Sequence, residues 1–279
     1  MKEITVSDWE GFEKELRKLE ESRAKRAAEM AERKAYVSPY LYRGQQKSLW
    51  GLQTTLERAT SEIITFRRYY RIIFGAKAKI ESFTNRRWDL PYPLSPEAPV
   101  LYTGNEHLPV LYEYMIHLRH HGFPSPLLDW TMSPYIAAYF AFKDARGQDN
   151  DSVAIYAYLE DIGLGKSGWV AEPQIHWLSP RVSTHPRHFL QQSVYTYCTQ
   201  IEENGGRQEI FASHEQAFSP DVDDPIQDLL WKISIPVSER RKVLEYLNRF
   251  NISSYSLFGS EESLMESLAI EVFDLDSSH

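Results

Sequence analysis

Two histidines, an aspartate, a tryptophan and a threonine stand close together in the stretch HHGFPSPLLDWT, residues 120–131. An aspartate beside an imidazole can orient it or share its proton, and an indole ring can stack on a flat ligand. Two prolines disfavour helix before them and hold the approach extended. We expect Asp129 or Thr131 to cap the apolar helix that follows, and this turn to direct His121 and Trp130 into a cleft. A cap alone would not explain the histidines or Trp130.

A second group lies in LYRGQ, residues 41–45, which is expected to be a short strand ending at Gly44. Arg43 would then lie at a sheet end, where its planar guanidinium suits a carboxylate or a phosphate. The glycine beside it allows close approach of a ligand or of another backbone. Taken alone, a structural salt bridge explains Arg43 as well as a binding role does.

A third group, RHFLQQSVYT at residues 187–196, places an arginine four residues before two glutamines that lead into a strand. Two amides there could bind a ligand or bridge backbone groups. Glu261 and Glu262 stand where carboxylates are favoured at a helix N-terminus. The chain lacks the G-x-S-x-G, phosphate-loop and dinucleotide-binding patterns. Adjacent histidines point in different directions on a helix, so HHGF does not predict a metal site, and we expect no metal.

Strands and helices must position these groups, and their order indicates a single α+β domain, since strict βαβ alternation is missing. We expect a mixed or antiparallel sheet core with flanking helices. An N-terminal strand and charged helix, residues 1–37, would belong to the same domain as residues 38–275. Strands are expected at 36–45, 152–161, 193–201 and 229–237, with residues 89–109 irregular and 162–186 loop-like. Helices are expected at 56–80, 110–122, 132–142 and 238–251, the last capped by Ser238, and a final helix follows Gly259.

Composition narrows the classes of function. The chain has 279 residues and a net charge of −8, from 31 basic and 39 acidic residues. This balance argues against nonspecific nucleic-acid binding, although a local basic patch is compatible with it. Cys198 is the single cysteine, so no internal disulfide can form. The first residues do not form a signal peptide, and no apolar run approaches the ~20 residues of a membrane span, so we expect a soluble cytoplasmic protein without a membrane partner.

Taken together, these segments resemble the FRG-domain family, which is named for an aromatic-Arg-Gly motif. YRGQ matches its F/Y-R-G-Q start, HHGFPSPLLDWT matches Q-H-x-G-x-P-T-R-L-L-D-W-T, and RHFLQQSVY matches R-x-x-x-Q-x-G-x-F. The order and spacing fit over about residues 1–270. The chain departs from the pattern at His120, where the family has Gln, at Pro126, where it often has Arg, and at Ser193, where it has Gly. The C-terminal L-F-P-D-L-D-G-L motif is degraded.

The FRG pattern in turn looks like that of the ADP-ribosyltransferase superfamily, which holds NAD with three sheet motifs. The resemblance implies that Arg43 takes the role of an arginine on the first strand and that DWT takes the role of a Ser-Thr-Ser segment. The QQSVY segment would replace a strand that carries an acidic residue, but Gln191 cannot supply a carboxylate. Asp129, Glu209 or Glu262 could supply the missing charge.

What the resemblance implies is an enzyme that uses NAD as its substrate and transfers ADP-ribose to a macromolecule or to water. Such an enzyme could act as a bacterial toxin or a phage-defence effector. The implied catalytic residues are Arg43, His121, Asp129 and Gln191. The implied NAD-binding residues are Tyr42, Arg43, Gly44, Gln45, Trp130, Thr131 and Tyr195. One alternative is a non-catalytic module that binds a nucleotide or a protein partner, and another is a hydrolase or nuclease that uses His120, His121 and Asp129.

Overall fold

The core of the fold is an eight-stranded sheet, seen in a computed structural model that describes residues 1–93, 108–147, 151–164, 172–178, 186–202, 208–218 and 227–275. The strands lie in the order β1-β8-β4-β2-β3-β6-β5, and β7 pairs with β6. Only β1 and β8 pair in parallel within this part of the chain, so the sheet is mixed and the α+β prediction is confirmed. The strands are β1 (Lys2–Thr5), β2 (Leu41–Gln45), β3 (Leu128–Thr131), β4 (Ser152–Leu159), β5 (Gln174–Leu178), β6 (Ser193–Glu202), β7 (Gln208–Phe211) and β8 (Leu229–Pro236).

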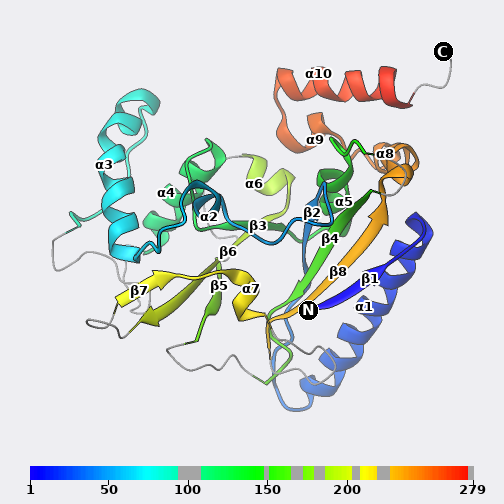
Figure 1. Cartoon of the computed structure of the whole chain (residues 1–279), viewed down its shortest axis with the longest axis horizontal. Helices are drawn as coiled ribbons and strands as arrows, with labels where there is room; N and C mark the ends of the chain where they lie inside the picture. Colours follow the sequence, from blue (N-terminus) through cyan, green and yellow to red (C-terminus); the bar gives the residue numbers. More distant parts are fainter. Residues whose placement is uncertain are drawn as a thin grey trace.

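Helices cover the sheet in two groups, and Figure 1 shows α1 running beside β1 and β8 while α3 and α4 lie toward the other end. One core cluster joins α1, α5 and α8 to β4 and β8, and a second joins α3 and α4 to β6. A third cluster contains Leu41, Trp130 and Tyr158. The helices are α1 (Trp9–Ala31), α2 (Thr55–Ala59), α3 (Phe66–Thr84), α4 (Leu108–His120), α5 (Pro134–Phe142), α6 (Pro186–Leu190), α7 (His214–Ala217), α8 (Arg240–Arg249), α9 (Ser254–Phe258) and α10 (Glu261–Ala269).

The apolar and β-branched runs form the strands that the sequence predicts. β4, β6 and β8 fall within the three runs expected at 152–161, 193–201 and 229–237, to within a residue. The expectation of one helix over 56–80 was wrong: α2 ends at Ala59, and α3 begins after Thr65, whose side chain accepts a bond from the N–H of Arg68. The loop expected at 162–186 contains β5. Part of the irregular segment expected at 89–109 lies outside the described residues.

Two predicted helix caps were also wrong. Ser133 caps α5 by accepting a hydrogen bond from the N–H of Ile136, while Asp129 and Thr131 belong to β3. Residues Val237–Glu239 form a 3₁₀ turn before α8, so Ser238 does not cap that helix. LDWT is therefore a strand, which changes what its side chains can reach, because alternate residues of a strand point to opposite faces. No helix in the described part of the chain could cross a bilayer.

Candidate functional site

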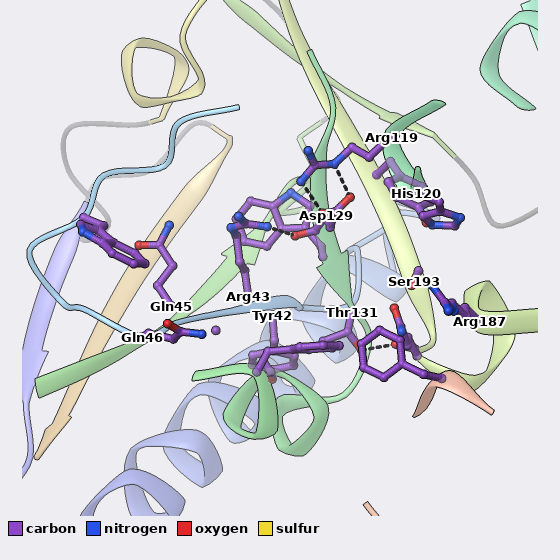
Figure 2. A pocket seen from close by; sticks show the side chains of 18 of the residues that line it. Tyr42, Arg43, Gln45, Gln46, Arg119, His120, Asp129, Thr131, Arg187 and Ser193 are labelled. Carbon is purple, nitrogen blue, oxygen red and sulfur yellow. Dashed lines mark hydrogen bonds and ion pairs between the residues drawn. The ribbon is translucent and has the colours of Figure 1, made fainter. Parts of the chain in front are cut away.

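The site forms at the boundary between the neighbouring strands β2 and β3, which we call the seam. Backbone pairing across this boundary is limited to one position. These strands pair at one position, Tyr42 opposite Thr131, whereas β2 pairs with β4 at five positions and β3 with β6 at four. Beyond this position the Nη1 of Arg43 donates a hydrogen bond of 2.7 Å to the backbone oxygen of Asp129. A side chain thus replaces the ladder, and a cleft of about 460 Å³ opens over the seam (Figure 2).

Arg43 carries a positive charge in this cleft that nearby negative charge offsets only in part. Its Nε is buried without a hydrogen-bond partner in the described structure. Burial lowers the pKa of Arg43 to about 10, against the opposing effect of Asp129, and the charges of Arg119 and Arg58 lower it further. The guanidinium is still protonated at neutral pH, so it brings a positive charge to the cleft.

Arg119 holds the carboxylate of Asp129 by two hydrogen bonds. Its Nε donates to Oδ1 at 2.7 Å and its Nη2 donates to Oδ2, while its Nη1 donates to the Thr55 hydroxyl at 2.8 Å. Burial alone would raise the pKa of Asp129, but the charge and hydrogen bonds of Arg119, helped by Arg43, lower it. Asp129 is therefore ionised at neutral pH with both oxygens engaged. Figure 2 shows Arg43 and Arg119 converging on it.

Two more arginines reach the cleft from other elements. Arg58, on α2, is exposed, and its side chain makes no hydrogen bond or ion pair with any described residue. Arg187, on α6, lies over the ring of Phe258 with its guanidinium carbon 5.2 Å from the ring centre. Among the described lining residues, four arginines face one carboxylate, that of Asp129. The cleft is thus strongly cationic in a chain whose net charge is −8.

The histidine in the cleft is His120, not His121. The Nε2 of His120 lies 2.7 Å from the hydroxyl of Tyr195, and both residues line the cleft. His121 is exposed, does not line the cleft, and packs its ring 4.5 Å from that of His117. Neighbouring residues of a helix point about 100° apart, so only one of the pair can face the seam. The position of His121 outside the cleft does not support the catalytic role that the family resemblance implied for it.

Two of the aromatic residues implied in NAD binding, Tyr42 and Trp130, belong to the core. The hydroxyl of Tyr42 donates to Glu20 of α1 at 2.8 Å, and the indole of Trp130 donates to Thr196 at 2.8 Å. Both side chains line the cleft but are buried, with at most 3% of their surface exposed. The accessible rings of the cleft are those of three residues that the sequence analysis did not select: Trp50, Phe140 and Phe258.

The sequence predicted that Gly44 allows close approach of either a ligand or another backbone, and the structure shows which of the two it is. A Cβ at this position would lie 1.9 Å from the backbone oxygen of Ala137 in α5. The glycine is therefore required by a packed helix rather than by a ligand. Next to it, Gln45 donates from Nε2 to the oxygen of Gly51 at 3.1 Å, while its Oε1 is buried without a partner in the described structure.

Gln191 and Thr131 tie the far end of the seam to the C-terminal helices. The Thr131 hydroxyl donates to the backbone oxygen of Gln191 at 2.7 Å and accepts from the N–H of Ser133 at 3.1 Å. The Gln191 amide donates to the backbone oxygen of Leu257 at 3.2 Å. Gln191 thus lines the cleft, but its donor is already bound to protein.

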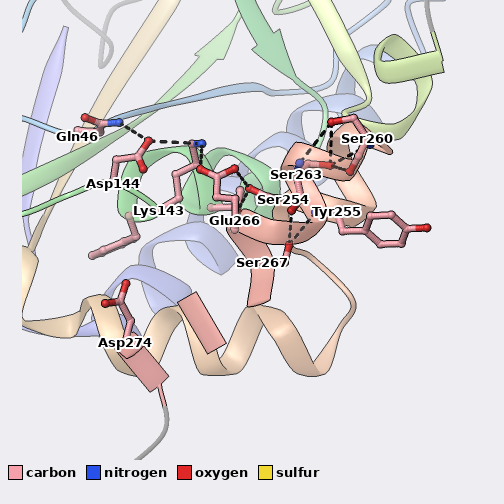
Figure 3. A network of polar contacts seen from close by, with 12 residues as sticks. Gln46, Lys143, Asp144, Ser254, Tyr255, Ser260, Ser263, Glu266, Ser267 and Asp274 are labelled. Atoms are coloured by element: carbon pink, nitrogen blue, oxygen red, sulfur yellow. Dashed lines mark hydrogen bonds and ion pairs between the residues drawn. The ribbon is translucent and has the colours of Figure 1, made fainter. Parts of the chain in front are cut away.

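A partly buried polar network joins α9 and α10 to α5 (Figure 3), and Phe258, the last residue of α9, lines the cleft. Lys143 donates to Glu266 at 2.7 Å, Glu266 accepts from Ser254, and the Ser254 hydroxyl lies 2.6 Å from that of Tyr139. Neither of the other carboxylates considered for the site, Glu209 and Glu262, is among the residues that line the cleft.

The residues missed by sequence reasoning gave weak signals. Arg119 precedes the double histidine by one position, and Arg58 stands in a short polar helix with no motif around it. The long-range contacts that bring them to the seam could not be read from spacing. A family model described as the FRG domain matches residues 38–150, which contain β2, β3 and three of the four arginines. No curated protein and no solved structure matches the chain.

Proposed function

Since the chain belongs to the FRG-domain family through residues 38–150, we propose that its cleft binds NAD and that the protein transfers ADP-ribose from NAD to a macromolecule or to water. The observation that carries this proposal is the excess of cations in the cleft. Four arginines face one carboxylate, and Arg119 already neutralises that carboxylate. Such a cleft favours a ligand with negative charge.

The donors and rings suit a dinucleotide in particular. The diphosphate of NAD has the geometry that guanidinium groups bind, and Arg43 and Arg58 have donors that no described residue uses. Trp50 and Phe258 offer accessible rings for flat bases. A volume of about 460 Å³ lies within the range of pockets that hold small ligands.

The reaction would depend mainly on position and charge. NAD supplies a leaving group, nicotinamide, whose departure puts positive charge on the ribose carbon. His120, whose Nε2 lies 2.7 Å from the Tyr195 hydroxyl, would accept a proton from an attacking hydroxyl or water. Asp129 is the described carboxylate of the cleft that could oppose the developing charge. A role as toxin or phage-defence effector stays a prediction.

A second candidate, a non-catalytic module that binds a nucleotide, is favoured by one observation. Both oxygens of Asp129 are engaged by Arg119, and the amide of Gln191 is engaged by Leu257. A carboxylate held in this way stabilises a nearby positive charge less well, because its partner cation opposes the effect. The hypothesis of a hydrolase or nuclease that uses His120, His121 and Asp129 loses one member, since His121 lies outside the cleft.

One experiment separates these candidates. Thermal unfolding is followed as NAD is added, and nicotinamide release is measured in the presence and absence of cell extract. The wild type, Arg43→Ala, Asp129→Asn and an exposed control on α1, Arg17→Ala, are compared. Stabilisation by NAD with nicotinamide release, both lost in Arg43→Ala and kept in Arg17→Ala, supports the enzyme. Stabilisation without release supports the binding module, and neither effect in the wild type rejects NAD as the ligand.

A further inference from the structure

Helix α3 carries a concentration of positive charge that the cleft does not use. Residues Phe66–Thr84 contain five basic residues and one acidic residue, a net charge of +4, in a chain of net charge −8. Figure 1 shows α3 at one end of the molecule, with α4 on its inner side. None of its residues lines the cleft described above.

The outer face of α3 follows a regular helical stripe. Its members are separated by three, four, four and three residues, so they lie close to one line along the helix. All five are exposed: Arg68, Arg71, Gly75, Lys79 and Ser82. The opposite face holds Phe66, Tyr69 and Ile73, which are buried in a core cluster. The stripe extends over about 21 Å, at 1.5 Å per residue.

The charges on this stripe have few partners. The side chains of Arg71 and Lys79 make no hydrogen bond or ion pair with any described residue. Arg68 pairs with Glu62 at 2.7 Å, but both side chains are more than half exposed, and such pairs exchange easily for another anion. Lys77, in contrast, lies off the stripe and binds Glu81 at 3.0 Å. The stripe therefore presents cations to solvent rather than to the fold.

Gly75 stands at the centre of the stripe without a reason inside the fold. A Cβ there would have no atom within 4 Å, and the backbone is helical, without a positive φ. Glycine is among the poorest helix formers, so its presence in the middle of a helix weakens it. Its effect on the surface is to lower the centre of the stripe, between Arg71 and Lys79, so that another chain can approach the helix backbone.

We propose that this stripe binds the phosphate backbone of a single-stranded nucleic acid. Arginine and lysine side chains with no protein partner would each replace counterions on a phosphate. Phe83 lies at the edge of the stripe with 91% of its surface exposed, and it gives a base a ring on which to stack. This inference does not depend on NAD binding, because the stripe and the cleft share no residue.

An anionic membrane is a poorer match to the same surface. A helix that inserts its side chains into a membrane presents large apolar residues along the face that carries its contact. The central line of this stripe has none, and the exposed apolar residues Ile72 and Phe83 lie to one side, eleven positions apart. The surface thus offers charge and one stacking ring rather than an apolar band.

The test is a binding titration with a fluorescent 20-nucleotide single-stranded RNA and its DNA equivalent, followed by anisotropy at several salt concentrations. The reversed-charge variant Arg71→Glu/Lys79→Glu is compared with Lys14→Glu/Lys25→Glu, an α1 control with the same change in net charge. We expect the α3 variant to weaken binding at least tenfold and to reduce the slope of log affinity against log salt by roughly one per lost contact. The α1 control should change affinity less than about twofold, since long-range effects are screened by salt.

Three results would overturn the proposal: no binding of either oligonucleotide by the wild type at low salt, equal loss in both variants, or binding to vesicles containing phosphatidylserine without binding to oligonucleotides. Circular dichroism and thermal unfolding show that each variant is folded. Gly75→Leu gives a further check, because it improves helix propensity while filling the centre of the stripe. We expect it to unfold at a higher temperature and bind the oligonucleotide more weakly, and unchanged binding would also contradict the proposal.

Discussion

Two seams of the same sheet differ in how they are held together. β4 and β8 pair at eight positions, from Ser152 opposite Pro236 to Leu159 opposite Leu229. β2 and β3 pair at one, and the guanidinium of Arg43 then takes the backbone oxygen of Asp129. The closed seam satisfies its polar groups with backbone alone, whereas the open seam needs a charged side chain for the same purpose. The cleft lies where the backbone hydrogen-bond ladder between β2 and β3 stops.

The difference has an energetic basis. In the closed seam β4 is almost entirely buried, and its apolar side chains stabilise the pairing on both faces. In the open seam the Asp129 oxygen would lose its partner without Arg43, and an unsatisfied buried polar group costs about 1–3 kcal/mol. Pairing at one position and one side-chain hydrogen bond hold the open seam, so it is joined more weakly than the closed seam.

The largest expected loss of stability tests whether the open seam depends on the close packing of α5 against β2 at Gly44. In Gly44→Ala the new Cβ would meet the oxygen of Ala137 at 1.9 Å, so helix and strand must separate. We expect a loss of about 3 kcal/mol in the free energy of unfolding, measured with urea. Gly75→Ala, where nothing lies within 4 Å, should stabilise slightly. A Gly44→Ala protein of normal stability would show that α5 does not clamp the seam.

A second, smaller effect should come from the side chain that replaces the ladder. Arg43→Ala removes the donor to Asp129 and is expected to cost about 2 kcal/mol in the free energy of unfolding. Arg43→Lys, which keeps a cation and one donor, should recover part of this loss. If Arg43→Ala unfolds at the same urea concentration as the wild type, the guanidinium does not hold the seam.

The charge of Arg43 also predicts the pH range of anion binding. Burial lowers its pKa to about 10, so it is protonated below that pH and loses its proton as the pH rises through it. The affinity for NAD should therefore be constant between pH 7 and 9 and fall as the pH passes about 10. Calorimetric titration across this range measures it, with Arg43→Lys as the comparison. A constant affinity up to pH 11, together with wild-type affinity in Arg43→Ala, would exclude Arg43 as the anion-binding group.

A fourth prediction concerns the ion pair between Arg119 and Asp129 beside the seam. The pKa of Asp129 is lowered in the folded protein, so its contribution to stability is complete above the unfolded value near 4 and is lost as the pH falls toward the folded value. Because 42% of its side chain is exposed, solvent screening limits the contribution to less than about 1 kcal/mol. Asp129→Asn should lack this dependence when unfolding is measured between pH 6 and 3. An unchanged pH dependence would mean that the pair contributes nothing.

The strands of the closed seam, β4 and β8, are easier to predict from the sequence than β3 of the open seam. The apolar runs of β4 and β8 predict their strands directly, because burial on both faces leaves a continuous apolar signal. β3 contains only LDWT, whose aspartate and threonine are as typical of a helix cap as of a strand. The prediction of a cap was wrong, and it also gave the wrong directions for the side chains of these residues.

Local sequence motifs identify some residues of the cleft, but they do not identify those that arrive there through tertiary packing. Arg43 and Asp129 belong to motifs and both line the cleft. Arg58 and Arg119 reach it through the packing of α2 and α4, which no local pattern encodes, and His120 replaced His121 because the phase of a helix is set by its core contacts. Motifs thus located the seam, while the charge that defines the cleft came from tertiary contacts.

The last prediction concerns the two faces of β2. Tyr42 and Arg43 are neighbours, and Tyr42 points to α1, where its hydroxyl donates to Glu20 at 2.8 Å. Tyr42→Phe removes that bond from the face opposite the cleft, so we expect a loss of about 1 kcal/mol in the free energy of unfolding and no change in NAD affinity. Urea unfolding and calorimetry on the same sample measure both. A loss of affinity in Tyr42→Phe, at unchanged stability, would place the Tyr42 hydroxyl on the ligand side and break the division between the structural and the binding face of this strand.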